Sequence, residues 1–215
     1  LKKLGAKIKI KNGYIIAKTT KGLIGKKIKL PSLSVGATEN AIIAASYAKG
    51  TTYLSNCACE PEIKDLTNFL KKMGVKINWI GERKIKISGK QNLKSVNHKV
   101  MFDRIESGTF IIAGALIGNK LKISGIEPKI LKKEISILKK MGVKIKVNKS
   151  DLIILKSNKI KPAYIKTEPY PGFPTDLQAQ IMVLMTKANG VSKIKENIFE
   201  NRFMHIPELR RMGAK

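Results

Sequence analysis

Apolar and polar residues alternate in short runs along this chain, and segments with helical spacing lie between the runs. Lysine alternates with Ile or Val at residues 7–11, 84–87 and 144–147. An alternation of period two predicts a strand with one apolar face and one solvated face. Residues 61–73 instead place apolar side chains at helical spacing, with a Pro in the first turn, where a missing N–H costs little. The pattern therefore predicts a mixed α/β structure.

One short phrase recurs at the junction between helix and strand. LKKLGAK, LKKMGVK, LKKMGVK and LRRMGAK begin at Leu1, Leu70, Leu138 and Leu209. A Gly just past a helix end adopts the left-handed conformation at no steric cost, so we expect the Gly of each phrase to stop a helix. The chain is therefore a tandem repeat. Because its first and last residues lie inside copies of the phrase, we expect it to be an internal piece of a longer protein.

Alignment of the copies predicts a unit of helix, strand, helix, strand and strand. In the first complete unit, which follows a strand at 27–30, these elements are expected at residues 34–49, 51–56, 61–73, 75–80 and 83–88. In the second unit they are expected at residues 105–117, 120–125, 129–141, 143–147 and 151–155. The third unit is expected to contain residues 174–188, 193–199 and 207–212. Each unit is too small to bury its own sheet face, which predicts an α/β fold whose units pack around shared helices.

The net charge of +28 on 215 residues raises the question of an anionic partner such as a nucleic acid. The lysines, however, are spread along the solvated faces of many predicted strands. Arginine occurs only five times, and no run of aromatic residues interleaves with basic ones to stack bases. We therefore expect no dedicated nucleic-acid partner. The longest apolar run, residues 110–118, is too short to span a bilayer, so no membrane partner is expected either.

Cys57 and Cys59 are the two cysteines, and no His or Cys set with metal-ligand spacing accompanies them. We expect reduced, structural thiols of a cytosolic protein and no bound metal.

The segment SVGAT, which begins at Ser34, follows a predicted strand and opens a helix. Exposed N–H groups at such a point, with Gly36 allowing close approach, favour an anion such as a phosphate. An ordinary helix start capped by Ser34 explains the same residues.

Three acidic residues at predicted helix starts are candidates for chemistry. Asp176 lies in a first helical turn after the Pro-rich loop 169–172, and it is either a general base or a partner of the helix dipole. Asp103 is explained by helix capping. Glu60 has a similar structural explanation, since it too lies near a helix start.

Taken together, these segments resemble one family. SVGATEN at Ser34, NCACEPEIKD at Asn56, DRIESGTF at Asp103, FPTDLQAQ at Phe173 and ENRFMH at Glu200 occur in the order and spacing of the UDP-N-acetylglucosamine enolpyruvyl transferases. The resemblance covers the whole chain. It implies an inside-out α/β barrel fold of two lobes with three units each. Residues 1–100 are then expected to form the C-terminal part of the first lobe, and residues 101–215 part of the second.

The resemblance also implies an activity. The family transfers the enolpyruvyl group of phosphoenolpyruvate to the 3′-hydroxyl of UDP-N-acetylglucosamine and releases phosphate, in the first committed step of peptidoglycan synthesis in the cytoplasm. The substrates are expected to bind in the cleft between the lobes. No metal or organic cofactor is implied.

Carried onto this sequence, the resemblance makes Asp176 the carboxylate that contacts and deprotonates the sugar hydroxyl. The other implied substrate-binding positions are the diphosphate-facing Ser34, Val35 and Gly36, the nucleotide-sugar contacts Ile198 (through its backbone), Phe199 and Arg202, and Asp103 and Glu60 near the reacting groups.

The chain departs from the family pattern in several places. The family often has a basic residue two positions before SVGAT, where this chain has Ser32. Neither Cys57 nor Cys59 matches the family's loop cysteine that protonates phosphoenolpyruvate, and the family's early Lys-Asn pair and late arginines have no counterpart. We therefore expect the chain to be inactive alone.

Two other functions fit parts of this pattern. The sister transferase that acts on shikimate 3-phosphate shares the fold and chemistry, but the segments FPTDLQAQ and ENRFMH fit a nucleotide sugar better. A non-catalytic basic binding module that kept the scaffold is the alternative from another class.

Overall fold

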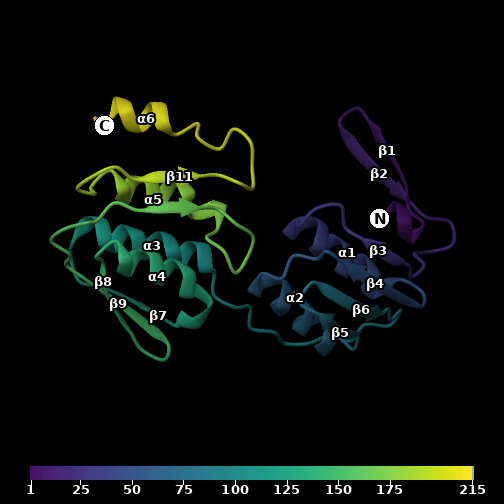
Figure 1. Ribbon diagram of the computed structural model, residues 1–215. Coiled ribbons are helices and arrows are strands. Elements are labelled where there is room, and N and C mark those ends of the chain that lie inside the picture. The colour runs from purple at the N-terminus through teal and green to yellow at the C-terminus, as the bar shows by residue number, and fades with distance from the viewer. Residues whose placement is uncertain (215) are drawn as a thin grey trace. The chain divides into compact units, whose positions relative to one another are not determined.

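The computed structural model describes residues 1–214, which form two compact units (Figure 1). The first unit is Leu1–Met101, and the second begins at Phe102. Each unit is mixed α/β. The assignment of the two units to two barrel lobes remains a prediction.

The first unit packs two helices on one face of a four-stranded sheet. It opens with the 3-10 turn η1 (Lys2–Leu4) and an antiparallel hairpin of β1 (Lys7–Lys11) and β2 (Tyr14–Lys18). The helices are α1 (Val35–Tyr47) and α2 (Pro61–Lys72). The sheet has the order β3 (Lys27–Lys29), β4 (Thr51–Ser55), β6 (Lys84–Ser88), β5 (Lys76–Gly81), in which only β3 and β4 are parallel.

The second unit combines a three-stranded antiparallel sheet with a shorter parallel pair. The three-stranded sheet has the order β7 (Leu121–Ser124), β9 (Asp151–Leu155), β8 (Lys144–Val147). The parallel pair is β10 (Tyr164–Lys166) with β11 (Lys193–Lys195). The helices and 3-10 turns are α3 (Arg104–Ile117), η2 (Pro128–Leu131), α4 (Lys132–Lys140), η3 (Thr175–Leu177), α5 (Gln178–Met185) and α6 (Ile206–Arg211).

The order of elements confirms the predicted repeat. Helix, strand, helix, strand and strand follow one another from α1 to β6 and again from α3 to β9. The glycine of each recurring phrase has a positive φ: 102° at Gly5, 99° at Gly74, 91° at Gly142 and 93° at Gly213. These are left-handed conformations, which Gly adopts without a steric penalty. Each phrase therefore does end a helical segment at its Gly.

Some predicted boundaries are wrong. The strand expected at 193–199 ends at Lys195, because the chain then turns around the side chain of Glu196. The helices expected at 129–141 and 174–188 both begin with a 3-10 turn, and the second ends at Met185. Strand β10 was not predicted at all, since three residues are too few to show an alternation.

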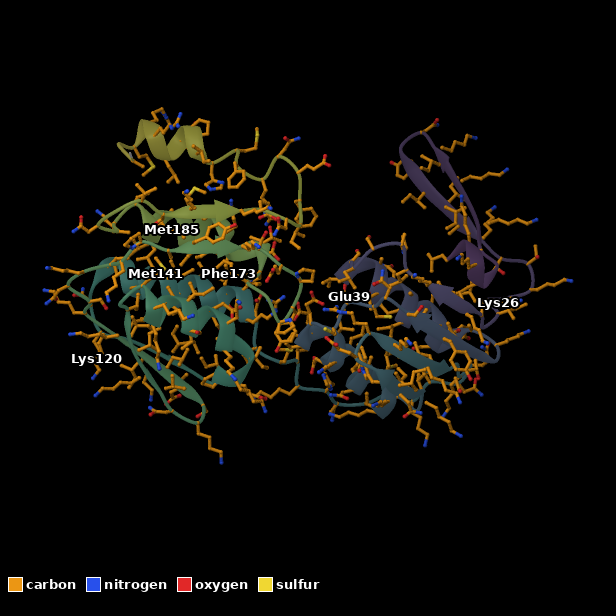
Figure 2. All side chains as sticks on the ribbon, viewed as in Figure 1. Lys26, Glu39, Lys120, Met141, Phe173 and Met185 are labelled. Atoms are coloured by element: carbon orange, nitrogen blue, oxygen red, sulfur yellow. The ribbon has the colours of Figure 1, made fainter. Side chains whose placement is uncertain are left out.

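Alternation along the strands separates the core from the solvent. In β6, Ile85 and Ile87 are fully buried beneath the helices. In the second unit, Met141 and Phe173 lie in the interior while Lys120 projects from the surface (Figure 2). Within residues 1–214, none of the helices combines the length and the apolar character needed to cross a membrane.

Replacing Gly142 by Ala should destabilise the second unit more than replacing Gly118. Both glycines have positive φ, a conformation that costs a residue with a Cβ roughly 1–2 kcal/mol. A Cβ at Gly142 would lie 2.9 Å from the Lys159 carbonyl oxygen, whereas at Gly118 the nearest atom would be 4.0 Å away. The overpacking at Gly142 should add about 1–3 kcal/mol. Urea unfolding measures both losses, and equal losses would show that the Lys159 contact is unimportant.

Candidate active site

The second unit brings together a carboxylate, a guanidinium and an aromatic ring. Arg202 Nη2 donates a hydrogen bond to Asp176 Oδ1 at 2.8 Å. The same guanidinium lies over the ring of Phe199, with its carbon 5.2 Å from the ring centroid. Asp176 is in η3, directly before α5, while the other two residues follow β11. The fold therefore gathers three of the predicted site residues from segments distant in sequence.

A residue that the sequence analysis did not select, Glu196, organises the backbone beside this cluster. Its Oε1 accepts hydrogen bonds from the N–H groups of Ile198 at 2.8 Å and Phe199 at 3.2 Å, and from the Thr167 hydroxyl at 2.8 Å. Its Oε2 accepts from the Thr175 hydroxyl at 2.8 Å. An acidic residue that ends the Lys and Ile alternation of β11 was the available signal.

The environment of Glu196 lowers the pKa of its carboxyl group. Burial is the largest influence and by itself would raise the pKa, but the donors from Ile198, Thr167, Thr175 and Phe199 together outweigh it. Hydrogen bonds to a carboxylate favour its charged form. The carboxyl group is therefore held as an anion by neutral donors.

Asp103 caps the N-terminus of α3, which is the structural explanation that the sequence analysis gave for this residue. Its Oδ1 accepts from the N–H groups of Ile105 at 2.7 Å and Glu106 at 3.1 Å at the start of α3. Its position near reacting groups remains a prediction from the family resemblance.

In the first unit, Ser34 caps α1, as the structural explanation expected. The N–H of Ala37 donates to Ser34 Oγ at 3.2 Å. Val35 and Gly36 form the first turn of the helix, and a Cβ built at Gly36 would meet nothing within 4 Å. The space beside this turn is therefore open, and the first N–H groups of a helix have no acceptor within it. A helix start of this kind favours an anion.

The start of α2 lies close to the start of α1. The Thr38 hydroxyl donates to the Ser34 carbonyl at 2.7 Å and accepts from the N–H of Ala58 at 2.9 Å. Burial is the main cause that raises the pKa of Glu39, and the charges of Glu62 and Glu60 raise it further. Glu60 itself is buried at the N-terminus of α2. The structure thus places Glu60 near the SVGAT turn.

Neither cysteine is in a disulfide, and both are buried. Burial raises the pKa of the Cys57 thiol to about 11, so the thiol is protonated at neutral pH and a poor nucleophile. Residues 1–214 contain no group of three or more His, Cys, Asp or Glu side chains placed to hold a metal ion.

Comparison with known proteins establishes the family. The sequence model of EPSP synthase (3-phosphoshikimate 1-carboxyvinyltransferase) matches residues 1–215. A UDP-N-acetylglucosamine 1-carboxyvinyltransferase of Pelagibacter ubique (strain HTCC1062) is 62% identical over 215 residues, which are 100% of this chain and 52% of that protein. UDP-N-acetylglucosamine 1-carboxyvinyltransferase 1 of Clostridium acetobutylicum is 51% identical, again over 100% of this chain and 51% of the relative.

Solved structures agree with the sequence matches. The enolpyruvyl transferase NikO from Streptomyces tendae superposes with a TM-score of 0.88 at 25% identity, covering 96% of this chain and 52% of NikO. An EPSP synthase from Acinetobacter baumannii gives a TM-score of 0.63 at 19% identity over 90% of this chain and 46% of the synthase, which shows a shared fold alone.

The chain therefore belongs to the enolpyruvyl transferase family. The relatives to which it is 62% and 51% identical are UDP-N-acetylglucosamine 1-carboxyvinyltransferases, which confirms the resemblance carried by the five motifs. The chain spans about half the length of the curated relatives it matches.

The lowered pKa of Glu196 predicts a specific pH dependence of stability. A carboxyl whose pKa is lower in the folded state than its ordinary value of 4.5 stabilises the fold above that value. The contribution is lost as the pH falls through the lower, folded-state pKa. The difference in unfolding free energy between wild type and Glu196→Gln should therefore be constant near neutral pH and shrink below about pH 4.5.

Urea unfolding at several pH values measures this difference. Glu200→Gln, which removes an exposed carboxylate from the same loop, is the control and should give a flatter difference. A Glu196→Gln difference that grows as the pH falls would contradict the assignment.

Proposed function

We propose that the full-length protein containing this chain is a UDP-N-acetylglucosamine 1-carboxyvinyltransferase. It transfers the enolpyruvyl group of phosphoenolpyruvate to the 3′-hydroxyl of UDP-N-acetylglucosamine and releases phosphate. The observation that carries the proposal is the cluster of Asp176, Arg202 and Phe199, in a chain 62% identical to an enzyme of that name.

Asp176 is the proposed general base. A sugar hydroxyl is a poor nucleophile at neutral pH, so a base within hydrogen-bond reach is required. Arg202 occupies Oδ1 of the carboxylate, and among the described residues no hydrogen bond or ion pair involves Oδ2. Oδ2 is therefore the atom that accepts the proton of the 3′-hydroxyl as the oxygen bonds to the enolpyruvyl carbon. The ion pair with Arg202 fixes the direction in which Oδ2 points.

Ile198 and Phe199 are the proposed contacts of the nucleotide sugar. Because the Ile198 N–H donates to Glu196, its carbonyl oxygen is the backbone group that remains for the substrate. Phe199 is 55% exposed, and the Arg202 guanidinium lies over its ring. The substrate would therefore meet an aromatic surface with a cation beside it.

The diphosphate is assigned to Ser34, Val35 and Gly36. Ser34 caps α1, and the open space at Gly36 leaves room for phosphate oxygens to approach the backbone. Glu60, close to this turn, and Asp103, at the start of α3, are proposed to lie near the reacting groups.

The substrates are consistent with the charge of the chain. Both UDP-N-acetylglucosamine and phosphoenolpyruvate are anions, and a net charge of +28 raises their local concentration without a dedicated nucleic-acid site. We place the reaction in the cytoplasm, where nucleotide sugars are made, as an early step of peptidoglycan synthesis. The alternative acceptor, shikimate 3-phosphate, is less well supported, because the EPSP synthase structure shares only the fold.

Replacing Asp176 by Asn in the full-length protein should lower kcat by about a hundredfold or more, since a general base typically contributes this much. Asn keeps the shape of the side chain but cannot accept the proton, so the fold and much of the sugar binding should remain. Steady-state kinetics with both substrates measures the effect. Asp151→Asn is the control, because Asp151 is another acid in the second unit and pairs with Lys122. Wild-type turnover in the Asp176 variant would remove this residue from the mechanism.

Replacing Gly36 by Ala should separate stability from binding. The added Cβ meets nothing in the protein, and Gly→Ala at a helical backbone conformation stabilises a protein by about 0.4–1 kcal/mol, because Ala restricts the unfolded chain more than Gly does. The variant should therefore be at least as stable as wild type, yet bind UDP-N-acetylglucosamine about tenfold more weakly, because the methyl group occupies the approach of the diphosphate. Calorimetric titration of the full-length protein measures the affinity, and unchanged affinity would place the diphosphate elsewhere.

A further inference from the structure

We infer that Glu196 is a positioning residue that sets the distance between the proposed base and the proposed nucleotide-sugar loop. The inference rests on the proposed function, because it concerns the same site. Neither the five motifs nor the comparisons assign a role to this residue.

The hydrogen bonds of Glu196 join three segments that are distant in sequence. Thr167 follows β10, Thr175 is the first residue of η3, and Ile198 and Phe199 are in the loop after β11. Both threonines are buried, with exposed fractions of 0% and 8%. Thr167 contributes a second bond, because its hydroxyl oxygen accepts from the N–H of Asn197 at 2.9 Å. The carboxylate is therefore the common acceptor at the place where the three segments meet.

The two ends of the network lie next to the two parts of the proposed site. Thr175 directly precedes Asp176 in η3. At the other end of the network, Glu196 Oε1 accepts hydrogen bonds from the N–H groups of Ile198 and Phe199. These bonds turn the backbone of both residues toward the carboxylate. A movement of Glu196 must therefore change either the position of Asp176 or the direction of the Ile198 carbonyl.

The partners of Glu196 among residues 1–214 are hydroxyl and amide groups, not cations. The two backbone N–H donors have fixed directions, and the two hydroxyl donors lie on short, buried side chains, whereas a lysine ammonium lies on a flexible stem. The chain has 43 Lys and Arg residues. Because the donors to Glu196 are uncharged, the geometry of the loop after β11 does not depend on these mobile side chains. This arrangement is the kind of supporting hydrogen-bond shell that holds a site in productive geometry.

The test uses Glu196→Ala, Glu196→Gln and Thr175→Val in the full-length protein. Glu196→Ala removes all four acceptor bonds and should raise the KM for UDP-N-acetylglucosamine about tenfold or more, while the KM for phosphoenolpyruvate changes little. Glu196→Gln keeps one oxygen and should rescue part of this loss. Thr175→Val cuts only the link to η3, so it should lower kcat more than it raises the KM.

A merely structural role predicts a different pattern. If the substitutions only destabilise the fold, part of the enzyme unfolds and the rest keeps a correctly shaped site. Apparent kcat then falls, while both KM values stay at those of wild type. That pattern in Glu196→Gln and Thr175→Val would overturn the inference even if Glu196→Ala did not fold. Glu168→Gln, which removes an exposed carboxylate next to Thr167, is the control and should leave all constants unchanged.

A second measurement separates this inference from the proposed function. Amide hydrogen exchange at Ile198 and Phe199 needs no catalysis, and it should become faster in Glu196→Gln than in Glu168→Gln. Faster exchange in a protein that lacks enolpyruvyl transfer would contradict the proposed function but keep the role of Glu196 in holding the loop. Unchanged exchange in an active enzyme would overturn the role of Glu196 and leave the function standing.

Discussion

The structure depends on a backbone conformation that only glycine adopts cheaply. After α2 and α4, Gly74 and Gly142 have φ values of 99° and 91°, and the chain turns there from a helix into a strand. Once the turn is fixed, the alternation of the strand decides which side chains meet the helices. Ile77 and Ile145 face inward, and the lysines between the apolar residues remain in water. The charge of +28 is thus compatible with a dense core, because the period of two keeps lysine and isoleucine on opposite faces.

Several candidate site residues have a structural role beside the chemical role proposed for them. Ser34 and Asp103 satisfy backbone donors at the starts of α1 and α3, as ordinary caps do. A capped helix start is also a rigid one, and its remaining N–H groups keep a fixed direction. Capping and the proposed substrate binding are therefore compatible at one position. The structural explanation of such residues therefore does not argue against a functional one.

The carboxylates of Asp176 and Glu196 are stabilised in different ways. Asp176 meets a guanidinium, and the pair is partly exposed, so its strength depends on the surrounding solvent. Glu196 is an anion surrounded by neutral donors, and its pKa is lowered although burial opposes this. The first arrangement leaves the second carboxylate oxygen of Asp176 for the proposed proton transfer. The second uses both oxygens for geometry, which suits a residue that holds a loop in place.

Reading the residues in order was enough to predict the repeat, the four glycine turns, most helix and strand positions, and the family. Those features depend on neighbours a few residues apart, and local periodicity and backbone sterics record them. Three features became visible only in the folded chain: Arg202 pairs with Asp176, β11 stops at Lys195, and Glu196 is the centre of a hydrogen-bond network. The donors Thr175 and Thr167 lie 21 and 29 residues from Glu196, so no local pattern reports them. Hydrogen bonds between distant segments exist only after the helices and strands have packed.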